Sequence, residues 1–246
     1  MHNPCRNLWT VFRREFRSYF NAPVAYVFLI AFLVLTGFLT FMVTGLYERR
    51  IADLDPFFFW HPWVYLLLVP AATMGLWAEE RRAGTIELLL TLPLTLTQVV
   101  LGKFLAAWAF IGIALLLTFP IVITVGFLGS PDYGVIVLGY LGSMLLAGAC
   151  VAVGGFASAL SRSQVIGFVV ALMICLLLNL AGFPPVTDLF ARWAPGLAEA
   201  VASISFMRYF DAMKRGVLDA RDIVYYLSAI ALALFATHLV VDNRKA

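Results

Sequence analysis

The sequence predicts an all-α membrane protein with six transmembrane helices. Of its 246 residues, 63% are hydrophobic and only 13% are charged, whereas soluble domains are usually about half apolar and about a quarter charged. A soluble globule cannot hide so much apolar side chain, because its surface must remain polar. Six long runs with almost no charge recur along the chain, and no internal repeat or second soluble domain is visible. We therefore treat residues 1–246 as a single transmembrane domain.

The six apolar runs have the length of membrane spans. A helix needs about 20 residues to cross about 30 Å of hydrocarbon. The first run carries no charge, the second is interrupted by His61, Pro62 and Pro70, and the fifth is short. The predicted spans are residues 22–46, 57–78, 104–128, 134–160, 165–181 and 223–241.

The positive charges predict the orientation, because Lys and Arg concentrate on the cytoplasmic side of a membrane. With both termini inside, the inner segments hold ten Lys and Arg, and the two short outer loops hold only Arg49 and Arg50. The long segment 182–222 carries further basic residues, which acidic residues balance. The first run is too long for a cleavable signal and is expected to stay in the protein. We predict a multi-pass protein of a bacterial inner membrane.

The N-terminal residues 1–21 are expected to form a cytoplasmic amphipathic helix. Between residues 8 and 20, apolar side chains recur at helical spacing, and the arginines lie mostly on other sides of the helix. Such a helix lies along the inner leaflet. Pro23 would then turn the chain into the membrane.

The run EERRAGTIELLLTLP, residues 79–93, predicts a short helix outside the membrane. Its four leading charges must lie at the membrane edge or beyond it. Gly84 permits a sharp reversal, Thr85 can cap a new helix, and Pro93 ends the run. A short helix with an exposed apolar side requires a groove on a partner.

The segment before the last span is too apolar for a simple linker. Residues 186–193 and 197–209 can each form a short helix, and Pro195 and Gly196 separate the two. Two interpretations stay open: the helices re-enter the membrane from outside, or they lie in the membrane interface.

Small residues predict close packing of the fourth span. Gly139, Gly142, Gly148, Gly154 and Gly155 give this span a face on which neighbouring helices can approach closely.

The order of these elements resembles the ABC-2 type permease family, and the chain is most similar to its gliding-motility-type branch. The resemblance covers nearly the whole chain, and its most specific part is the run Glu-Glu-Arg-x-x-Gly-Thr-x-Glu-Leu-Leu. It implies a connecting helix at residues 8–20 and extracellular re-entrant helices at residues 184–209. It also implies a coupling helix that docks on an ATP-binding subunit, formed by Gly84, Thr85, Ile86, Glu87, Leu88, Leu89 and Leu90.

The resemblance implies the permease subunit of an ATP-driven transporter that exports its substrate. Its expected partners are two copies of an ATP-binding subunit, a second permease chain that is identical or related, membrane lipid and a periplasmic auxiliary subunit. The chain has no G-x-x-x-x-G-K-[ST] motif, because Gly102-Lys103 is followed by Phe104. We therefore expect ATP and Mg²⁺ in the partner subunit, and no catalytic, cofactor or metal site in this chain.

Other function classes fit the sequence less well. A non-conducting mechanotransmission or anchoring subunit of an envelope complex is the main alternative. A secondary transporter usually keeps charges within its spans, and nucleic-acid binding requires a basic block that this chain lacks. Ser143 with His238 does not have the G-x-S-x-G setting of a serine hydrolase. The three widely spaced cysteines predict neither a disulfide framework nor a metal site.

Charged residues on the connecting and coupling segments are candidates for ion pairs between them. We expect Arg81 and Arg82 to pair with Glu15, and Glu79 or Glu80 to pair with an arginine of the N-terminal helix. The alternative is a solvated charge cluster that marks the membrane edge. The candidates are Arg13, Arg14, Glu15, Arg17, Glu79, Glu80, Arg81 and Arg82.

Four polar residues within the spans are candidates for lining a translocation path. Thr36, Thr40 and Thr44 follow one another at four-residue spacing, and Asn179 is the most polar side chain in the fifth span. The alternative is hydrogen bonding to their own helix or to a neighbouring one, which we favour.

Overall fold

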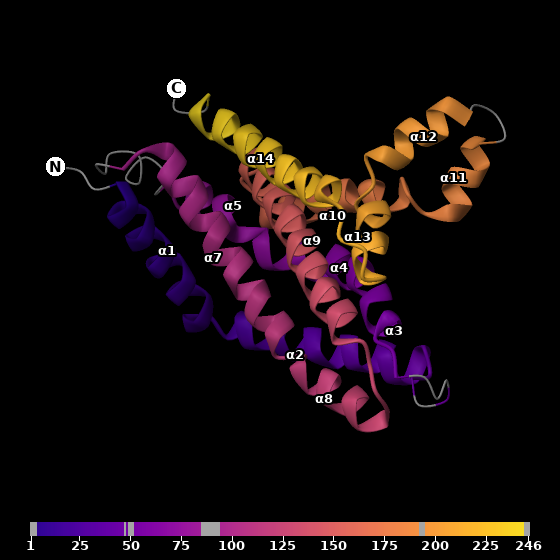
Figure 1. The fold of residues 1–246 in the computed structure, drawn as a ribbon. Coiled ribbons are helices and arrows are strands. Elements are labelled where there is room, and N and C mark those ends of the chain that lie inside the picture. The colour runs from indigo at the N-terminus through magenta and orange to yellow at the C-terminus, as the bar shows by residue number, and fades with distance from the viewer. Residues whose placement is uncertain (1–3, 47, 49–51, 85–93, 192–194, 244–246) are drawn as a thin grey trace.

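The computed structural model describes residues 4–46, 48, 52–84, 94–191 and 195–243, and every regular element in them is a helix (Figure 1). The first half contains α1 (Pro4–Asn21), α2 (Pro23–Phe38), the π-helix η1 (Leu39–Val43), α3 (Asp55–Phe59), α4 (His61–Thr73), α5 (Gly75–Ala83), α7 (Leu96–Leu116) and α8 (Phe119–Leu128). The second half contains α9 (Tyr133–Leu160), α10 (Gln164–Leu180), α11 (Pro184–Ala191), α12 (Pro195–Ser203), α13 (Phe206–Lys214) and α14 (Ala220–Asp242).

Four helical stretches in the described part of the chain are long and apolar enough to cross a membrane. They correspond to the first, third, fourth and sixth predicted spans and comprise Pro23–Val43, Leu96–Leu128, Tyr133–Leu160 and Ala220–Asp242. The fifth predicted span is the shorter apolar helix α10. The second is divided at Trp60 and Met74 into α3, α4 and α5.

The third predicted span begins earlier than expected, at residue 96 rather than 104. The reason is a capping box at its start: the Thr95 hydroxyl accepts from the Gln98 amide at 3.4 Å, and the Gln98 side chain accepts from the Thr95 amide at 3.2 Å. These bonds satisfy backbone groups that the first helical turn leaves free. Lys103 therefore lies two turns inside α7 and not ahead of it.

The segment before α14 forms three short helices, so the prediction of one helix over residues 197–209 is wrong. The Ser205 hydroxyl accepts from the Met207 amide at 3.1 Å and caps α13, which separates it from α12. In Figure 1, α11 and α12 lie side by side and project away from the other helices. By contrast, α13 packs against α9, α10 and α14.

The long helix α9 is the centre of the bundle (Figure 1). It contacts α4, α5, α7, α10, α13 and α14. Its glycines permit these contacts, as the sequence predicted: a Cβ atom on Gly139 would lie 2.4 Å from the Phe58 ring, and one on Gly154 would lie 2.0 Å from the Thr73 hydroxyl. Because no real Cβ approaches so closely, both positions require glycine.

We predict that Gly154→Ala destabilises the protein and that Gly155→Ala does not. A Cβ on Gly154 would also lie 2.9 Å from the Thr73 Cβ, so α4 itself must move, whereas the Gly155 position meets its nearest atom at 3.8 Å. Overpacking of this kind costs about 1–3 kcal/mol, while alanine is otherwise the better helix former. Thermal unfolding of the two variants in the same detergent measures the difference, and equal unfolding temperatures would contradict the prediction.

Candidate functional site

A cluster of four charged side chains joins three helices. The Lys103 ammonium of α7 lies 2.9 Å from Glu80 Oε1 of α5 and 3.2 Å from Glu15 Oε2 of α1. The Lys103 side chain is only 4% exposed, and its ammonium also lies 5.4 Å from the centre of the Trp77 ring. Arg14 completes the group, which we call the Lys103 cluster: Arg14, Glu15, Glu80 and Lys103. A buried lysine requires such partners, because an unpaired charge there would be costly.

The cluster balances two positive charges with two negative ones. Arg14 donates to Glu15 Oε1 at 2.8 Å and lies 4.0 Å from Glu80 Oε1. Its side chain is 56% exposed, so water weakens its contribution. Burial by itself would raise the pKa of Glu15, but Lys103 and Arg14 outweigh burial and hold this pKa below its usual value. Glu15 is therefore ionised at neutral pH and can pair with both cations.

Close packing of α1 on α7 positions Glu15 next to Lys103. Val11 lies directly on Gly102, where an added Cβ would come within 2.6 Å of a Val11 methyl group. Two turns further along, Tyr19 stacks on Phe110 with ring centres 4.8 Å apart. The Tyr19 hydroxyl donates to the Ala72 carbonyl at 3.2 Å, and burial, followed by Glu15 and Glu79, raises its pKa, so it stays protonated. These contacts fix the rotation of α1 about its axis.

The predicted charged residues divide into three groups. Arg14, Glu15 and Glu80 meet in the cluster, while Glu79 accepts a bond from the Gln164 amide of α10 at 2.7 Å. Arg13, Arg17 and Arg82 are exposed and Arg81 is half-buried. In the ion pairs between described residues, Glu15 pairs with Arg14 and Lys103, not with Arg81 or Arg82. The sequence interpretation missed Lys103, although a lone lysine two turns inside an apolar helix was a usable signal.

The helix that carries Glu80 is connected to α4 through a break at Met74. Ser158 of α9 satisfies backbone groups of Met74 itself and of the first turn of α5. Its hydroxyl donates to the Met74 carbonyl at 2.7 Å and accepts from the amides of Trp77 at 3.0 Å and Ala78 at 3.2 Å. A single side chain of α9 therefore holds the first turn of α5 in place.

The other end of α5 leads to the predicted coupling helix. Gly84 ends α5 in the left-handed conformation, with φ of 69°, and its amide bonds to the Arg81 carbonyl at 3.4 Å. Gly84 thus has the left-handed conformation that glycine adopts without cost. The remaining residues of that prediction, Thr85, Ile86, Glu87, Leu88, Leu89 and Leu90, lie outside the described residues.

The four candidate path residues make hydrogen bonds within the protein. Thr36 and Thr40 donate to carbonyls one turn earlier, at 2.6 and 2.7 Å. Thr44 donates to the Leu39 carbonyl at 2.9 Å and accepts from the Trp60 indole at 2.9 Å. Asn179 donates to the Pro62 carbonyl at 3.2 Å. In this conformation they stabilise helices, and a path-lining role stays a prediction.

One buried histidine links α4 to α9. His61 Nδ1 lies 2.6 Å from the Ser143 hydroxyl, and both side chains are fully buried. The contact therefore joins α4 to α9 in the interior of the bundle. Cys150 and Cys175 are buried free thiols. Within the described residues, no group of three or more His, Cys, Asp or Glu side chains has the arrangement of a metal site.

Comparison with known proteins gives one family match. Residues 9–241 match the family described as ABC-2 family transporter protein. Among curated proteins, no match to this chain was found. The matched range includes the cluster, the Met74 break and, apart from Asp242 at the end of the last one, the four candidate spans.

We predict that Lys103→Met loosens α1 from the bundle. The change leaves Glu15 and Glu80 facing each other without the buried cation, which costs on the order of 2–4 kcal/mol. Thermal unfolding and the protease sensitivity of residues 4–21 measure the effect.

Two further variants test the cause. Arg14→Gln removes the exposed cation and should cost less than about 1 kcal/mol. Combining Lys103→Met with Glu15→Gln and Glu80→Gln removes the repulsion and should restore part of the lost stability. If the triple variant is less stable than Lys103→Met alone, the cluster is not the cause.

Proposed function

As the chain belongs to the ABC-2 transporter family, we propose that it forms the membrane-spanning permease of an ATP-driven exporter. Two permease chains and two separate ATP-binding subunits make the working unit, and ATP with Mg²⁺ is bound by the latter. We place the protein in a bacterial inner membrane with both termini in the cytoplasm, as the distribution of Lys and Arg favours.

We propose that the chain crosses the membrane six times, although four helical stretches among the described residues are long and apolar enough to do so. The helix α10 has 17 residues and is about 25 Å long at 1.5 Å per residue, which the flanking residues can extend to the membrane thickness. The α3–α5 run supports a second additional crossing. Its breaks are tolerable in a membrane because side chains of neighbouring helices satisfy the exposed backbone groups.

The observation that carries this proposal is the Lys103 cluster, which includes Glu80 of the helix that ends at Gly84. It binds α1, α5 and the start of α7 to one another within a few residues of Gly84. A displacement of residues 84–90 by an ATP-binding subunit would reach α5 first. Because charge-assisted bonds at 2.9 and 3.2 Å connect α5 to α7 and α7 to α1, the three helices would move together.

The break at Met74 supplies the pivot in this mechanism. There the helix is interrupted between α4 and α5, so α5 can tilt against α4. Ser158 transmits the tilt, since it bonds to the first turn of α5 and belongs to α9. In turn, α9 contacts α10, α13 and α14, so the movement would reach the opposite end of the bundle.

A second function remains a candidate, in which the permease transmits force and conducts no solute. The observation that favours it is the internal bonding of Thr36 and Thr40, whose hydroxyls donate to carbonyls of their own helix. The sequence resemblance to the gliding-motility-type branch is compatible with either role, because a fold does not determine function.

Cross-linking tests the proposed coupling. Single cysteines at Thr85, Ile86 and Leu89, in the full complex in native membranes, should form cross-links to an ATP-binding subunit that change when ATP is added. The control is a cysteine at Phe127, near the C-terminal end of α8. It should form no cross-link to the ATP-binding subunit. Absence of any cross-link from residues 85–90 to a nucleotide-hydrolysing protein would overturn the assignment. ATP-dependent substrate movement into inverted vesicles would then distinguish export from force transmission.

We predict that Ser158→Ala uncouples α5 from α9. The loss of its three hydrogen bonds leaves buried backbone groups unsatisfied and costs about 1–3 kcal/mol. The test is hydrogen–deuterium exchange of the complex that contains this variant, measured with and without ATP. ATP should change the exchange of residues 76–83 but no longer that of α9.

Ser228→Ala is the matched control, because the Ser228 hydroxyl bonds only within its own helix, to the Tyr225 carbonyl at 2.7 Å. It should leave the ATP-dependent exchange of α9 unchanged. If ATP changes the exchange of α9 equally in Ser158→Ala and in the native protein, the proposed role of Ser158 is refuted.

A further inference from the structure

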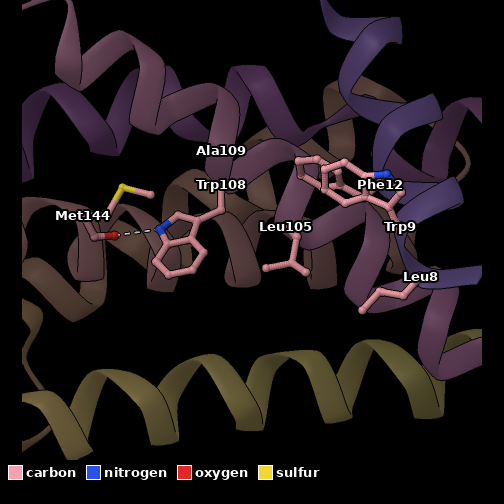
Figure 2. A pocket seen from close by; sticks show the side chains of 7 residues that line it. All are labelled: Leu8, Trp9, Phe12, Leu105, Trp108, Ala109 and Met144. Carbon is pink, nitrogen blue, oxygen red and sulfur yellow. Dashed lines mark hydrogen bonds between the residues drawn. The ribbon is translucent and has the colours of Figure 1, made fainter. Parts of the chain in front are cut away.

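An apolar groove of about 310 Å³ runs beside the contact between α1 and α7 (Figure 2). Figure 2 shows its lining from three helices, with the α1 side chains at one end and Trp108 and Met144 at the other. The volume is at the lower end of the range for small-molecule sites. The main lining residues are Leu8, Trp9 and Phe12 from α1, Leu105 and Trp108 from α7, and Met144 from α9.

The surface of this groove is suited to hydrocarbon. The indole N–H of Trp108 already donates to the Met144 carbonyl at 2.8 Å (dashed in Figure 2). Trp9 stacks on Phe12 with ring centres 5.1 Å apart and remains 61% exposed. An exposed aromatic side chain of this size next to an apolar groove gains free energy when an apolar group covers both.

The outer side of α1 next to the groove is basic. Arg6, Arg13 and Arg17 are separated by seven and four residues, so they lie along one side of the helix. All three are exposed. Arg6 precedes Trp9 by three residues and Arg13 follows it by four, which makes both its neighbours on the helix surface. Glu15, the acidic residue of α1, pairs with Lys103 of α7. It therefore does not neutralise the arginine side of the helix.

We propose that the groove and its arginines bind an anionic phospholipid. One acyl chain lies in the groove against Leu105 and Trp108, and the phosphate lies at Arg6 and Arg13. The apolar groove matches the acyl chain of such a lipid, and the adjacent arginines match its phosphate. Each basic residue near an anionic lipid surface contributes about 1 kcal/mol to binding. The proposal does not depend on the transport function, because it requires only that the chain lie in a membrane.

The same charges argue against a second copy of this chain as the occupant. In a twofold dimer the same surface patch faces itself. The arginine side of one α1 would then lie against the arginine side of the other, which is repulsive. An anionic lipid would neutralise the positive charge of these arginines, whereas a second copy of the chain would double it.

Fluorescence quenching by brominated lipids in nanodiscs tests the site with the full-length chain. The protein is compared in nanodiscs with acyl-brominated phosphatidylglycerol and with acyl-brominated phosphatidylcholine at the same mole fraction. Trp9→Phe identifies the share of the signal that comes from the groove. We expect phosphatidylglycerol to quench the Trp9 share at several-fold lower mole fraction than phosphatidylcholine.

The variant Arg6→Gln with Arg13→Gln should weaken this preference by about fivefold for each arginine removed. Its matched control is Arg208→Gln with Arg221→Gln, because these arginines are also exposed but belong to α13 and α14. The control should keep the preference. All four arginines are at the surface, so both double variants are expected to fold.

Two results would overturn the proposal. Equal quenching of Trp9 by both lipids means that the groove contacts ordinary surrounding lipid without selecting a headgroup. Failure of both lipids to quench Trp9 means that protein covers the groove, and cross-linking between copies through a cysteine at Trp9 would identify a second chain as the cover. Loss of the preference in the control variant would equally contradict a role for Arg6 and Arg13.

Discussion

The need to satisfy every backbone amide and carbonyl in apolar surroundings is the constraint on which this structure depends. Its helices are interrupted several times, and polar side chains bond to backbone groups at two of these interruptions. Ser158 bonds to Met74 and to the first turn of α5. Thr118 donates to the Leu115 carbonyl at 2.6 Å between α7 and α8 and is joined there by the Tyr140 hydroxyl at 2.9 Å. Buried polar groups that look like candidates for solute contact are therefore first of all requirements of irregular helices.

The bundle is held at both ends by a lysine between carboxylates. At one end Lys103 joins three helices. At the other, Lys214 of α13 lies 3.3 Å from Asp55 at the start of α3 and 3.1 Å from Asp211. Figure 1 shows α3 and α13 far from the N-terminal end of α1. Between these ends lies α9, whose glycines permit contact so close that neighbouring helices have little freedom to slide. Such a body transmits movement by tilting whole helices, since its packed interior resists local deformation.

The sequence was sufficient for features that depend on local chemistry. The apolar runs, the glycine face of α9, the amphipathic α1 and the left-handed Gly84 all follow from residue type and spacing. It was insufficient where a distant residue decides the outcome. His61 and Pro62 lie directly after the break at Trp60, but Pro70 lies inside α4, and the second break is at Met74, where Ser158 of another helix bonds to the backbone. The importance of Lys103 depends on Glu15, which lies 88 positions earlier. By contrast, the break before α13 was predictable, because Ser205 is a good capping residue within an otherwise continuous apolar pattern.

That long separation has a consequence for biogenesis. When α1 emerges from the ribosome, neither Gly102 nor Lys103 has been synthesised, so the helix has no docking surface. It can dock only after the candidate span Pro23–Val43 and the helices α3 to α5 have been made. Only when α7 enters the bilayer can Glu15 leave water for a compensating ammonium. The N-terminal helix should thus be the first part of the nascent chain to be made and one of the later parts to reach its final position.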